Sequence, residues 1–600
     1  MCGIAGKLSF IGTPVDTADI RKMTDRLAHR GPDDEGVFVD GPIGLGHRRL
    51  SIIDLSPKGH QPMSDPTGDV WIVFNGEIYN YRSLRTQLES DGVRFVSETD
   101  TEVIIHLYKR HGVQCLGHLR GMFAFGIWDA RLRRLFVARD RVGKKPLKYY
   151  VDAQRFVFAS ELKALFADPH VPKHIDHEAV DEYLTFGYVP HPRTGFLGIQ
   201  KLEPAHYLLV EASGKVQKER YWQLDFSTKQ SRSHEEWKQM IERELREAVR
   251  LRLISDVPLG AHLSGGLDSS LVVAMMAKET SRPVKTFSIG FVEDSHNELP
   301  FAREVARLYQ TDHHEFVVEP KAADILPRIA EHLEEPFADP SILPTWYLSQ
   351  LTREHVTVAL NGDGGDENFA GYARYQAMRH YERLRRLHPL VCALRRPLSR
   401  TMKDRRHVAS LLNAYDWSRA KTYLGLRRMV EGHTGLASVE ALFSQAQHQD
   451  WRDRLLSVDI ASYLPDDLLV KADMASMAHA LEMRSPFLDH PLMELVAAMP
   501  PELKLHGRSS KVMLKHIARA YLPDSIIDRT KKGFTIPHSH WLRTSLNPLL
   551  KEVLSDDALA PWGFDRVALA RLVYEHEHGC DHGLPLWTLM MLRLWMRAWF

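Results

Sequence analysis

Cysteine is scarce in this chain, which has four (Cys2, Cys115, Cys392 and Cys580) among 600 residues. They lie far apart and form no CxxC pair, which argues against a disulfide framework and for a reducing compartment. An excess of one charge is also missing, because 78 Lys and Arg balance 77 Asp and Glu. Without an overall field toward nucleic acid or anionic lipid, we expect neither as a partner.

Long apolar runs are missing too. The nearest one, the C-terminal LWTLMMLRLWMRAWF, is interrupted by Arg593 and Arg597 and predicts an amphipathic helix. A membrane span would need about 18–20 apolar residues. No basic region followed by an apolar core opens the chain, so a signal peptide is not expected. These absences predict a soluble, cytoplasmic protein, and its length predicts two to four domains.

The chain changes character along its length. Up to about residue 210 it has short β-type runs separated by turns, such as the strand Val70–Phe74 ending at Asn75-Gly76. Residues 211–235 are polar and are expected to form a linker. Ser233 and Glu236 then form a capping box that opens a helix. Strands and helices alternate beyond it, which predicts a doubly wound parallel sheet, followed by a mostly helical tail from about residue 370.

Cys2 stands at an unusual place. If Met1 is removed, Cys2 combines a thiol with a free α-amine, whose ordinary pKa of about 7.7–8.0 suits it as a base. The first six residues alone do not decide whether Cys2 acts as a nucleophile. The simpler interpretation is that Cys2 is an incidental small residue.

A glycine-rich loop, LSGGLDSS over 263–270, lies between an expected strand and an expected helix. Ligands of open α/β sheets bind at that carboxyl edge. The glycines, the helix N-terminus and the serines suit a phosphate group. The lysine of a Walker A loop is missing, and a serine-capped tight turn stays open as the alternative.

A second loop, NGDGGDE over 361–367, follows another expected strand. Its carboxylates suit Mg²⁺, which prefers oxygen ligands and the company of phosphates. A solvated acidic turn is the alternative here. Two such loops on one sheet edge favour a site for a nucleotide and Mg²⁺.

These loops belong to a longer series of motifs. In chain order it reads MCGIAG, HRGPDDEG, HRRLSIID, FNGEIYN, SETDTEVI, LRGMFAFGIWD, RDRVGKKPL, LSGGLDSS, NGDGGDE, MRSPFLD and GRSSKVMLK. The series resembles the glutamine-hydrolysing asparagine synthetases of bacterial type. That resemblance implies an α/β multidomain chain: a four-layer αββα N-terminal-nucleophile glutaminase domain over 1–210, the linker, and a doubly wound ATP-pyrophosphatase synthetase domain over 236–600.

The resemblance assigns roles to residues of the first domain. Cys2 is implied as the nucleophile that attacks the glutamine amide, giving a thioester and ammonia. Asn75 and Gly76 are implied as the oxyanion hole. Arg49 would bind the α-carboxylate of glutamine, and Asp100 with Glu77 its ammonium. The binding set is thus Arg49, Asn75, Glu77 and Asp100.

In the second domain the resemblance implies an ATP site. Its residues would be Leu263, Ser264, Gly265, Gly266, Asp268, Ser269, Ser270, Ile289 and Gly362. Asp268 and Asp366 would hold Mg²⁺, and Lys511 would approach the α-phosphate. The implied reaction adenylates aspartate, releases pyrophosphate and forms asparagine with ammonia that has travelled through an internal passage. A homodimer is left open.

Several positions depart from the family pattern. Asp363 stands where well-known members have Glu as the base for incoming ammonia, which puts that role and the acceptor in doubt. Met474 replaces a basic residue close to the expected nucleotide cleft, and Lys148 replaces a Tyr. His576, His578, Cys580 and His582 invite a metal interpretation, but their spacing puts them on different faces of a helix. Residues 379–407 are strongly basic and are expected to be a solvated helical insertion.

Three alternatives stay open. One keeps the chemistry and changes the acceptor to another carboxylate, on a surface polysaccharide or a secondary metabolite. Another is a lactam-forming cyclase, which intact glutaminase residues disfavour. The third is a catalytically silent scaffold, which predicts an uncleaved Met1.

Overall fold

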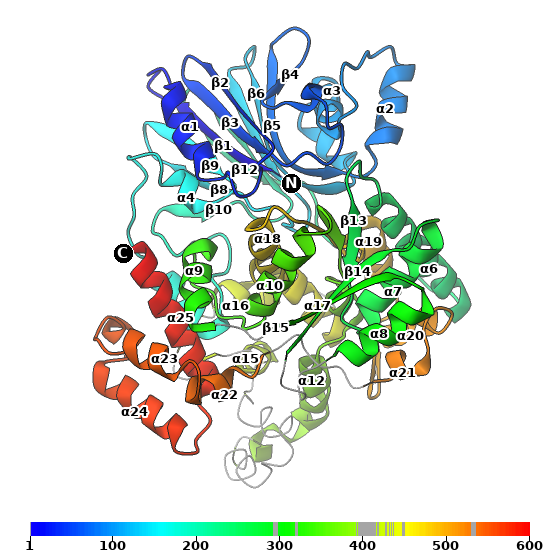
Figure 1. The fold of residues 1–600 in the computed structure, drawn as a ribbon, viewed down its shortest axis with the longest axis vertical. Coiled ribbons are helices and arrows are strands. Elements are labelled where there is room, and N and C mark those ends of the chain that lie inside the picture. Colours follow the sequence, from blue (N-terminus) through cyan, green and yellow to red (C-terminus); the bar gives the residue numbers. More distant parts are fainter. Residues whose placement is uncertain are drawn as a thin grey trace.

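The computed structural model describes residues 2–291, 298–318, 322–391, 393, 416, 419–426, 429–430, 433, 435, 437–446, 450–529 and 536–600. Two units pack against each other (Figure 1). The first contains the strands up to residue 220, and the second contains the parallel sheet and most helices.

Two antiparallel six-stranded sheets form the centre of the first unit. In spatial order, the first sheet has β10 (Ile199–Lys201), β8 (Lys148–Val151), β9 (Arg155–Ala159), β1 (Gly3–Ser9), β3 (Ile43–Arg49) and β2 (Asp34–Asp40). The second has β12 (Val216–Arg220), β11 (His206–Glu211), β7 (Arg134–Arg139), β6 (Gly121–Asp129), β5 (Val70–Ile78) and β4 (Met63–Ser64).

The two sheets share a buried apolar layer, to which Ile4 and Leu8 of β1 and Val73 of β5 contribute. Alternate residues of these strands face this layer, as the period of a strand requires. Helices α1 (Thr17–Asp25) and α4 (Leu162–Leu165) contact the first sheet, and α3 (Asp100–His111), next to α2 (Tyr81–Ser90), contacts the second. The predicted αββα layering is confirmed. Helix α5 (His177–Phe186) follows.

The expected boundaries 1–210 and 211–235 remain a prediction, but β12 bears on them. Val216–Arg220 pairs with β11 and so belongs to the sheet of the first unit. After it, Ser233 and Glu236 form the predicted capping box, and α6 (His234–Arg252) follows.

The second unit contains a five-stranded parallel sheet, as predicted from the alternating pattern. Its order is β15 (Asp312–Val318), β14 (Lys285–Phe291), β13 (Leu259–His262), β16 (Val358–Leu360) and β17 (Glu482–Arg484). The neighbours β13 and β16 are followed by the glycine-rich and the acidic loop respectively. Both loops therefore lie at one sheet edge.

Helices surround this sheet and form the C-terminal part (Figure 1). They are α7 (Leu267–Glu279), α8 (Leu299–Leu308), α9 (Ala322–Leu333), α10 (Ile342–Arg353), α11 (Gly365–Phe369), α12 (Ala373–Leu384), α15 (Arg419–Gly425), α16 (Ala437–Gln445), α17 (Trp451–Ala461), α18 (Leu469–Met477), α19 (His490–Ala498), α20 (Val512–Ala518), α21 (Asp524–Ile527), α22 (His538–Arg543), α23 (Asn547–Val553), α24 (Arg566–Glu577) and α25 (Gly583–Trp599). A short hairpin joins β18 (Leu505–His506) and β19 (Ser509–Ser510). The predicted C-terminal helix is α25, and residues 394–407 of the basic segment lie outside the described residues.

Buried ion pairs cross between the units. The guanidinium of Arg30 is fully buried and lies 2.6 Å from Glu161 and 2.7 Å from Asp473 of α18. Lys145 lies 3.2 Å from Asp473, and Lys148 lies 3.2 Å from Glu334. Buried charges need such partners because an uncompensated charge costs several kcal/mol. These pairs fix how the two units meet.

Candidate active sites

Cys2 lies directly before β1 and is only 7% exposed. Its backbone N–H donates to Asn75 Oδ1 at 3.0 Å, and its carbonyl accepts from Arg30 Nε at 3.1 Å. Burial raises the pKa of the Cys2 thiol, and the Leu50 amide and Arg49 act in the opposite direction. The backbone of Cys2 is thus held by Asn75 and Arg30, and its side chain is buried.

Asn75 and Gly76 do not lie past the end of a strand, as the sequence suggested, but inside β5. The run of pairs with β6 continues through Asn75–Ala124 and Gly76–Phe123 to residue 78, because the turn-forming Asn-Gly pair is overridden by its long partner strand. A Cβ on Gly76 would come within 2.2 Å of the Met122 carbonyl oxygen, so this close approach requires glycine. Asn75 Nδ2 is buried and has no hydrogen-bond partner among the described residues. This donor beside Cys2 can therefore serve an oxyanion.

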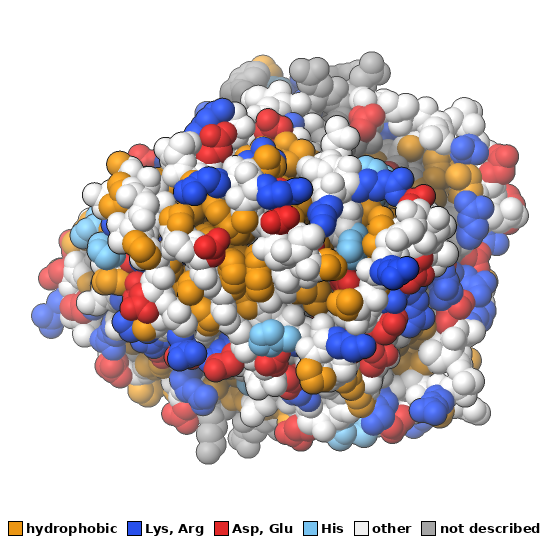
Figure 2. Space-filling view, turned by 90° about the horizontal axis from the view of Figure 1, so that it is seen from above, with side chains coloured by type: hydrophobic (Ala, Val, Ile, Leu, Met, Phe, Trp, Pro, Cys, Tyr) orange, Lys and Arg blue, Asp and Glu red, His pale blue; other side chains and the backbone are white. Residues whose placement is uncertain are grey.

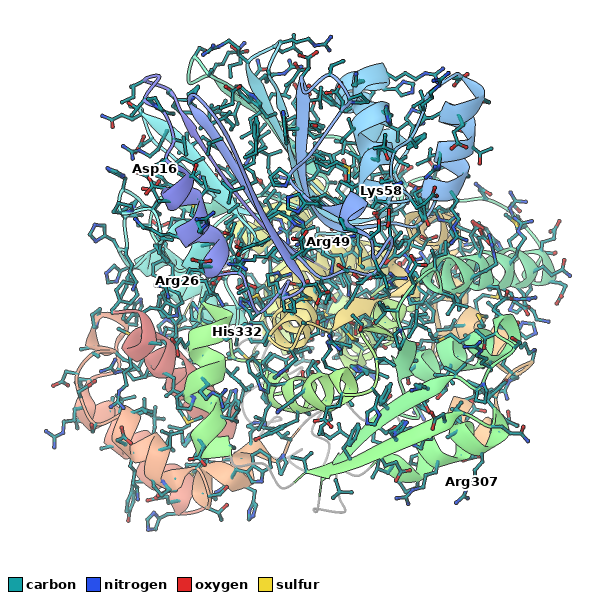
Figure 3. All side chains as sticks on the ribbon, turned by 45° about the horizontal axis from the view of Figure 1, so that its top comes forward. Asp16, Arg26, Arg49, Lys58, Arg307 and His332 are labelled. Atoms are coloured by element: carbon teal, nitrogen blue, oxygen red, sulfur yellow. The ribbon has the colours of Figure 1, made fainter. Side chains whose placement is uncertain are left out.

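Arg49 is the last residue of β3 and lies where the first unit faces the second (Figure 3). Its guanidinium donates to three carbonyl oxygens of the following loop: Ser56 at 3.2 Å, Ile53 at 3.3 Å and Asp54 at 2.5 Å. The loop carbonyls orient the side chain near Cys2, whose thiol pKa it lowers. A Cβ on Gly59 would collide with this guanidinium, 1.9 Å from Nη2, so Gly59 makes room for it.

Glu77 and Asp100 come together in a buried acidic pocket. Asp100 opens α3, and its Oδ2 accepts from the Ile78 amide at 2.8 Å. Burial, opposed by this hydrogen bond, raises the pKa of Asp100 to about 6. Burial and the nearby Asp100 raise the pKa of Glu77 well above its usual range. Glu77 Oε1 has no hydrogen-bond partner among the described residues, whereas Oε2 accepts from Arg484 at 3.0 Å.

The second site is a cavity of about 480 Å³ at the carboxyl edge of the parallel sheet. Most residues predicted for ATP and its reaction line it: Leu263, Ser264, Gly266, Asp268, Ser269, Ile289, Gly362, Asp363, Asp366 and Lys511. Gly265 and Ser270 do not. Gly265 is packed against Phe301 and Ala302, where a Cβ would come within 2.6 Å, and Ser270 is fully buried in α7.

The two loops pack closely at this edge. A Cβ on Gly362 would lie 2.8 Å from the Ser269 amide nitrogen, so only glycine lets the acidic loop approach the start of α7. Ser264 Oγ lies 3.0 Å from Ser269 Oγ and accepts from the Gly266 amide at 3.2 Å. The hydroxyls and the helix N-terminus give the loop the donors that a phosphate requires.

Lys511 lies between the two predicted metal ligands. Its Nζ contacts Asp268 and lies 2.7 Å from Asp366 Oδ1. Both carboxylates raise the pKa of Lys511, against the effect of burial. Two carboxylates around one cation form a donor set that also fits Mg²⁺.

Asp363 lines the cavity, and its Oδ2 accepts from Asn361 Nδ2 at 2.5 Å. Asn361 Oδ1 in turn accepts from Ser485 Oγ at 2.7 Å, and Ser485 Oγ accepts from Lys144 Nζ of the first unit at 2.8 Å. Burial lowers the pKa of Lys144 to about 8. A buried polar chain thus runs from the first unit to the edge of the cavity.

Sequence reasoning missed several charged residues of the cavity. Lys471 lies 2.6 Å from Asp339, and both line it. Arg529 also lines it, contacts Glu298 and donates to the Gly265 carbonyl at 3.1 Å. Lys471 lies three residues before Met474, which departs from the family pattern, whereas no local signal marked Arg529.

Two departures from the family pattern have a structural account. Met474 does not line the cavity, contrary to expectation. It is buried in an apolar core, since α18 turns Asp473 and not Met474 toward the charges of the first unit. Lys148 forms the buried interdomain pair with Glu334. Met474 is therefore a core residue, and Lys148 takes part in the contact between the units.

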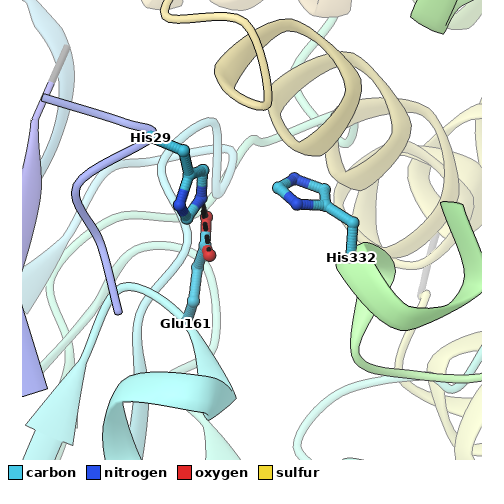
Figure 4. A group of neighbouring side chains, drawn as sticks. All are labelled: His29, Glu161 and His332. Carbon is cyan, nitrogen blue, oxygen red and sulfur yellow. Dashed lines mark hydrogen bonds and ion pairs between the residues drawn. The ribbon is translucent and has the colours of Figure 1, made fainter. Parts of the chain in front are cut away.

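The C-terminal histidines do not converge. His576 Nε2 bonds to the Ser539 carbonyl, His578 to the Tyr574 carbonyl and His582 to Glu575. The one group with metal-ligand spacing among the described residues is His29, Glu161 and His332 (Figure 4). Lys163 lies 2.9 Å from Glu161 and 3.4 Å from His332 Nδ1, so the ammonium of Lys163 already contacts two of these three side chains.

The surface shows no one-sided charge on the face in Figure 2, where acidic and basic side chains alternate around an apolar area. No helix within the described ranges is both long and apolar enough to cross a membrane.

Known protein families match both parts of the chain. The sequence model of the family described as asparagine synthase matches residues 240–597. The chain belongs to the asparagine synthase family. A glutamine amidotransferase domain matches residues 1–222, which include Cys2, Asn75 and Asp100.

Individual relatives of this asparagine synthase family member span nearly its whole length. Glutamine-hydrolyzing asparagine synthetase 1 of Bacillus subtilis is 32% identical over 614 residues, covering 99% of this chain and 96% of that protein. The putative asparagine synthetase of Mycobacterium tuberculosis H37Rv is 32% identical, covering 99% of this chain and 97% of that protein. Amidase chry2 of Gibberella zeae is 30% identical and covers 94% of this chain and 93% of that protein.

Proposed function

We propose that this chain is a glutamine-dependent asparagine synthetase of the cytoplasm. Glutamine is hydrolysed at Cys2, and the ammonia formed is used in the second unit to convert aspartate into asparagine at the expense of ATP. The observation that carries the proposal is the hydrogen bond from the Cys2 backbone N–H to Asn75 Oδ1, because the same side chain carries the unsatisfied donor Nδ2.

In the first unit, the Cys2 thiolate attacks the side-chain amide carbon of glutamine. The α-amine exposed by loss of Met1 takes up the thiol proton and passes it to the departing ammonia. Asn75 Nδ2 and the Gly76 amide donate to the oxyanion that forms, and water then hydrolyses the thioester to glutamate. Charge stabilisation of this kind contributes about 10²–10³-fold per donor.

Substrate recognition uses the charges around Cys2. The Arg49 guanidinium would bind the α-carboxylate of glutamine, and Glu77 and Asp100 its α-ammonium. The unsatisfied Glu77 Oε1 supports this assignment, because a buried carboxylate oxygen without a donor favours an incoming cation.

In the second unit, ATP would bind with its phosphates at the Ser264–Ser270 loop. Lys511 stabilises the charge that builds on the α-phosphate as the aspartate carboxylate attacks it, and pyrophosphate leaves. Ammonia then displaces AMP from the β-aspartyl adenylate, with Asp363 positioned at the cavity to accept its proton. Asp268 and Asp366 would hold Mg²⁺, which supplies charge neutralisation for the phosphates.

A different carboxylate acceptor is the second candidate. Asp363 has a shorter side chain than the Glu of well-known family members, and two relatives at 30% identity are named as amidases, chry2 of Gibberella zeae and chyE of Penicillium rubens. The same chemistry on another carboxylate fits both observations.

The test is a product balance with purified protein, glutamine, ATP, Mg²⁺ and L-aspartate, following asparagine, glutamate, AMP and pyrophosphate. Asparagine and pyrophosphate that rise in a one-to-one ratio support the proposal. Glutamate without asparagine contradicts aspartate as the acceptor and favours the second candidate. No glutamate at all contradicts the glutaminase assignment.

A further inference from the structure

The motif MRSPFLD over residues 483–489 contributes an arginine to the first unit although it belongs to the second. Arg484 ends β17, the edge strand that pairs with β16 next to the acidic loop. It is 0% exposed, and its guanidinium points away from the cavity toward the glutamine pocket. It does not line the cavity, whereas its neighbour Met483 does.

Each part of this guanidinium has a fixed partner. Nε donates to Glu482 Oε1 at 2.6 Å, and Nη1 donates to the carbonyls of Arg252 at 2.8 Å and Ile254 at 2.6 Å. Nη2 donates to Glu77 Oε2 at 3.0 Å. Its partners on two segments of the second unit, β17 and the end of α6, therefore hold Arg484 against β5.

The hydrogen bond from Arg484 affects both the charge and the orientation of the Glu77 side chain. Burial, Asp100 and Glu482 each oppose a negative charge on Glu77, and Arg484 favours one. Because Oε2 is bound to Arg484, the side chain is oriented with Oε1 left for another donor. Without the guanidinium, the buried carboxylates of Glu77, Asp100 and Glu482 would still act on one another, and Lys145 would remain as a cation near Glu482.

We propose that Arg484 is a positioning residue for glutamine hydrolysis: supplied by the synthetase unit, it orients Glu77 so that Glu77 Oε1 meets the α-ammonium of glutamine. This inference rests on the proposed glutaminase function. It means that the glutamine pocket is complete only when the second unit is in place. The neighbouring Ser485 contacts Asn361 at 2.7 Å, so the same short segment contacts the acidic loop of the cavity.

The first test compares Arg484→Lys with wild type, using the full chain. A lysine keeps the charge but loses the planar fork, so it cannot hold Glu77 and the two carbonyls at once. We expect KM for glutamine to rise about tenfold, the equivalent of ~1.4 kcal/mol. Synthesis from ammonium chloride should stay within about twofold, since the cavity is untouched. An equal loss with ammonia would overturn the inference and show a general structural role.

A second readout separates positioning from stability. Glutaramate, which is glutamine without the α-amine, offers no ammonium to Glu77, so Arg484→Lys should not weaken its hydrolysis. The lower pH limit of kcat/KM for glutamine should move upward in the variant, because Glu77, facing Asp100 and Glu482, loses the guanidinium hydrogen bond to Oε2 that favours its charged form. An unchanged pH limit, or an equal penalty for both substrates, would contradict the proposal.

Arg252→Lys is the matched control. Arg252 is also a buried arginine near Tyr79, but its side chain pairs with Asp489 at 3.1 Å and not with Glu77. Its contact with Arg484 is through the backbone carbonyl, which the substitution keeps. Arg252→Lys should lower the melting temperature without moving the pH limit for glutamine, and a movement as large as that of Arg484→Lys would overturn the assignment. Absence of glutaminase activity in wild type would instead refute the proposed function itself.

Discussion

Arg30 of the first unit lies 2.7 Å from Asp473 of the second, and both side chains are buried. With Glu161 at 2.6 Å on the other side, this arginine joins the N-terminal segment near Cys2 to α18. The backbone of Cys2 and the second unit therefore share one electrostatic anchor.

Replacement of this anchor should destabilise the protein strongly. Arg30→Met leaves Glu161 and Asp473 less compensated in the interior, which costs about 3–5 kcal/mol for a buried pair. We expect a clear fall in the melting temperature, measured by differential scanning calorimetry.

Arg571→Met is the control for that experiment. Arg571 pairs with Glu575 one helical turn away at 2.7 Å and is 78% exposed, a type of pair worth about 0.3–0.5 kcal/mol. Equal melting temperatures for the two variants would refute the role of the anchor.

The oxyanion assignment predicts a selective kinetic defect. Asn75→Ala removes a buried donor, so glutamine hydrolysis should fall about 10²–10³-fold. Synthesis from ammonium chloride should be retained, and Gln87→Ala, on the exposed side of α2, should change neither rate. Unimpaired hydrolysis in Asn75→Ala would exclude this amide as the oxyanion donor.

Glutamine use should depend on pH through Asp100. Its pKa is raised to about 6, so the carboxylate gains a proton, and loses its attraction for the substrate ammonium, as the pH falls through that value. We expect kcat/KM for glutamine to fall about tenfold per pH unit below pH ~6. Asp100→Asn should show low kcat/KM with a weaker pH dependence. A profile identical to wild type would contradict the assignment.

Lys511 should be required for synthesis in the second unit and not for glutamine hydrolysis in the first. Lys511→Met removes the cation between Asp268 and Asp366, and we expect synthesis to fall at least about 10²-fold with either nitrogen source. Glutamine hydrolysis should persist. Lys551→Met, an exposed lysine of α23, is the control. Synthesis that survives in Lys511→Met would show that this ammonium does not act on the phosphates.

Local sequence signals predicted the elements that carry the cavity. The strand–glycine loop–helix pattern placed Ser264 and Asp268 correctly at the carboxyl edge, and the capping box at Ser233 marked the start of α6. Asn75 was misplaced relative to its strand, because long-range pairing with Ala124 overrides a local turn signal.

Contacts between the units could not be predicted in the same way. Arg484 and Glu77 are 407 positions apart, and each is an ordinary charged residue in its own segment. Such pairs arise only when the two units pack together, since their geometry depends on packing and not on sequence spacing. The partners of Arg30, Lys145 and Lys148 in the second unit could not be predicted for the same reason.

The central claim is that glutamine hydrolysis and synthesis occupy separate sites of one chain. Cys2→Ala tests it most directly, with product formation measured from glutamine and from ammonium chloride under the same conditions. We predict loss of glutamine-dependent product and retention of ammonia-dependent product near the wild-type rate. Loss of both activities in a folded Cys2→Ala protein would contradict the separation of the two sites.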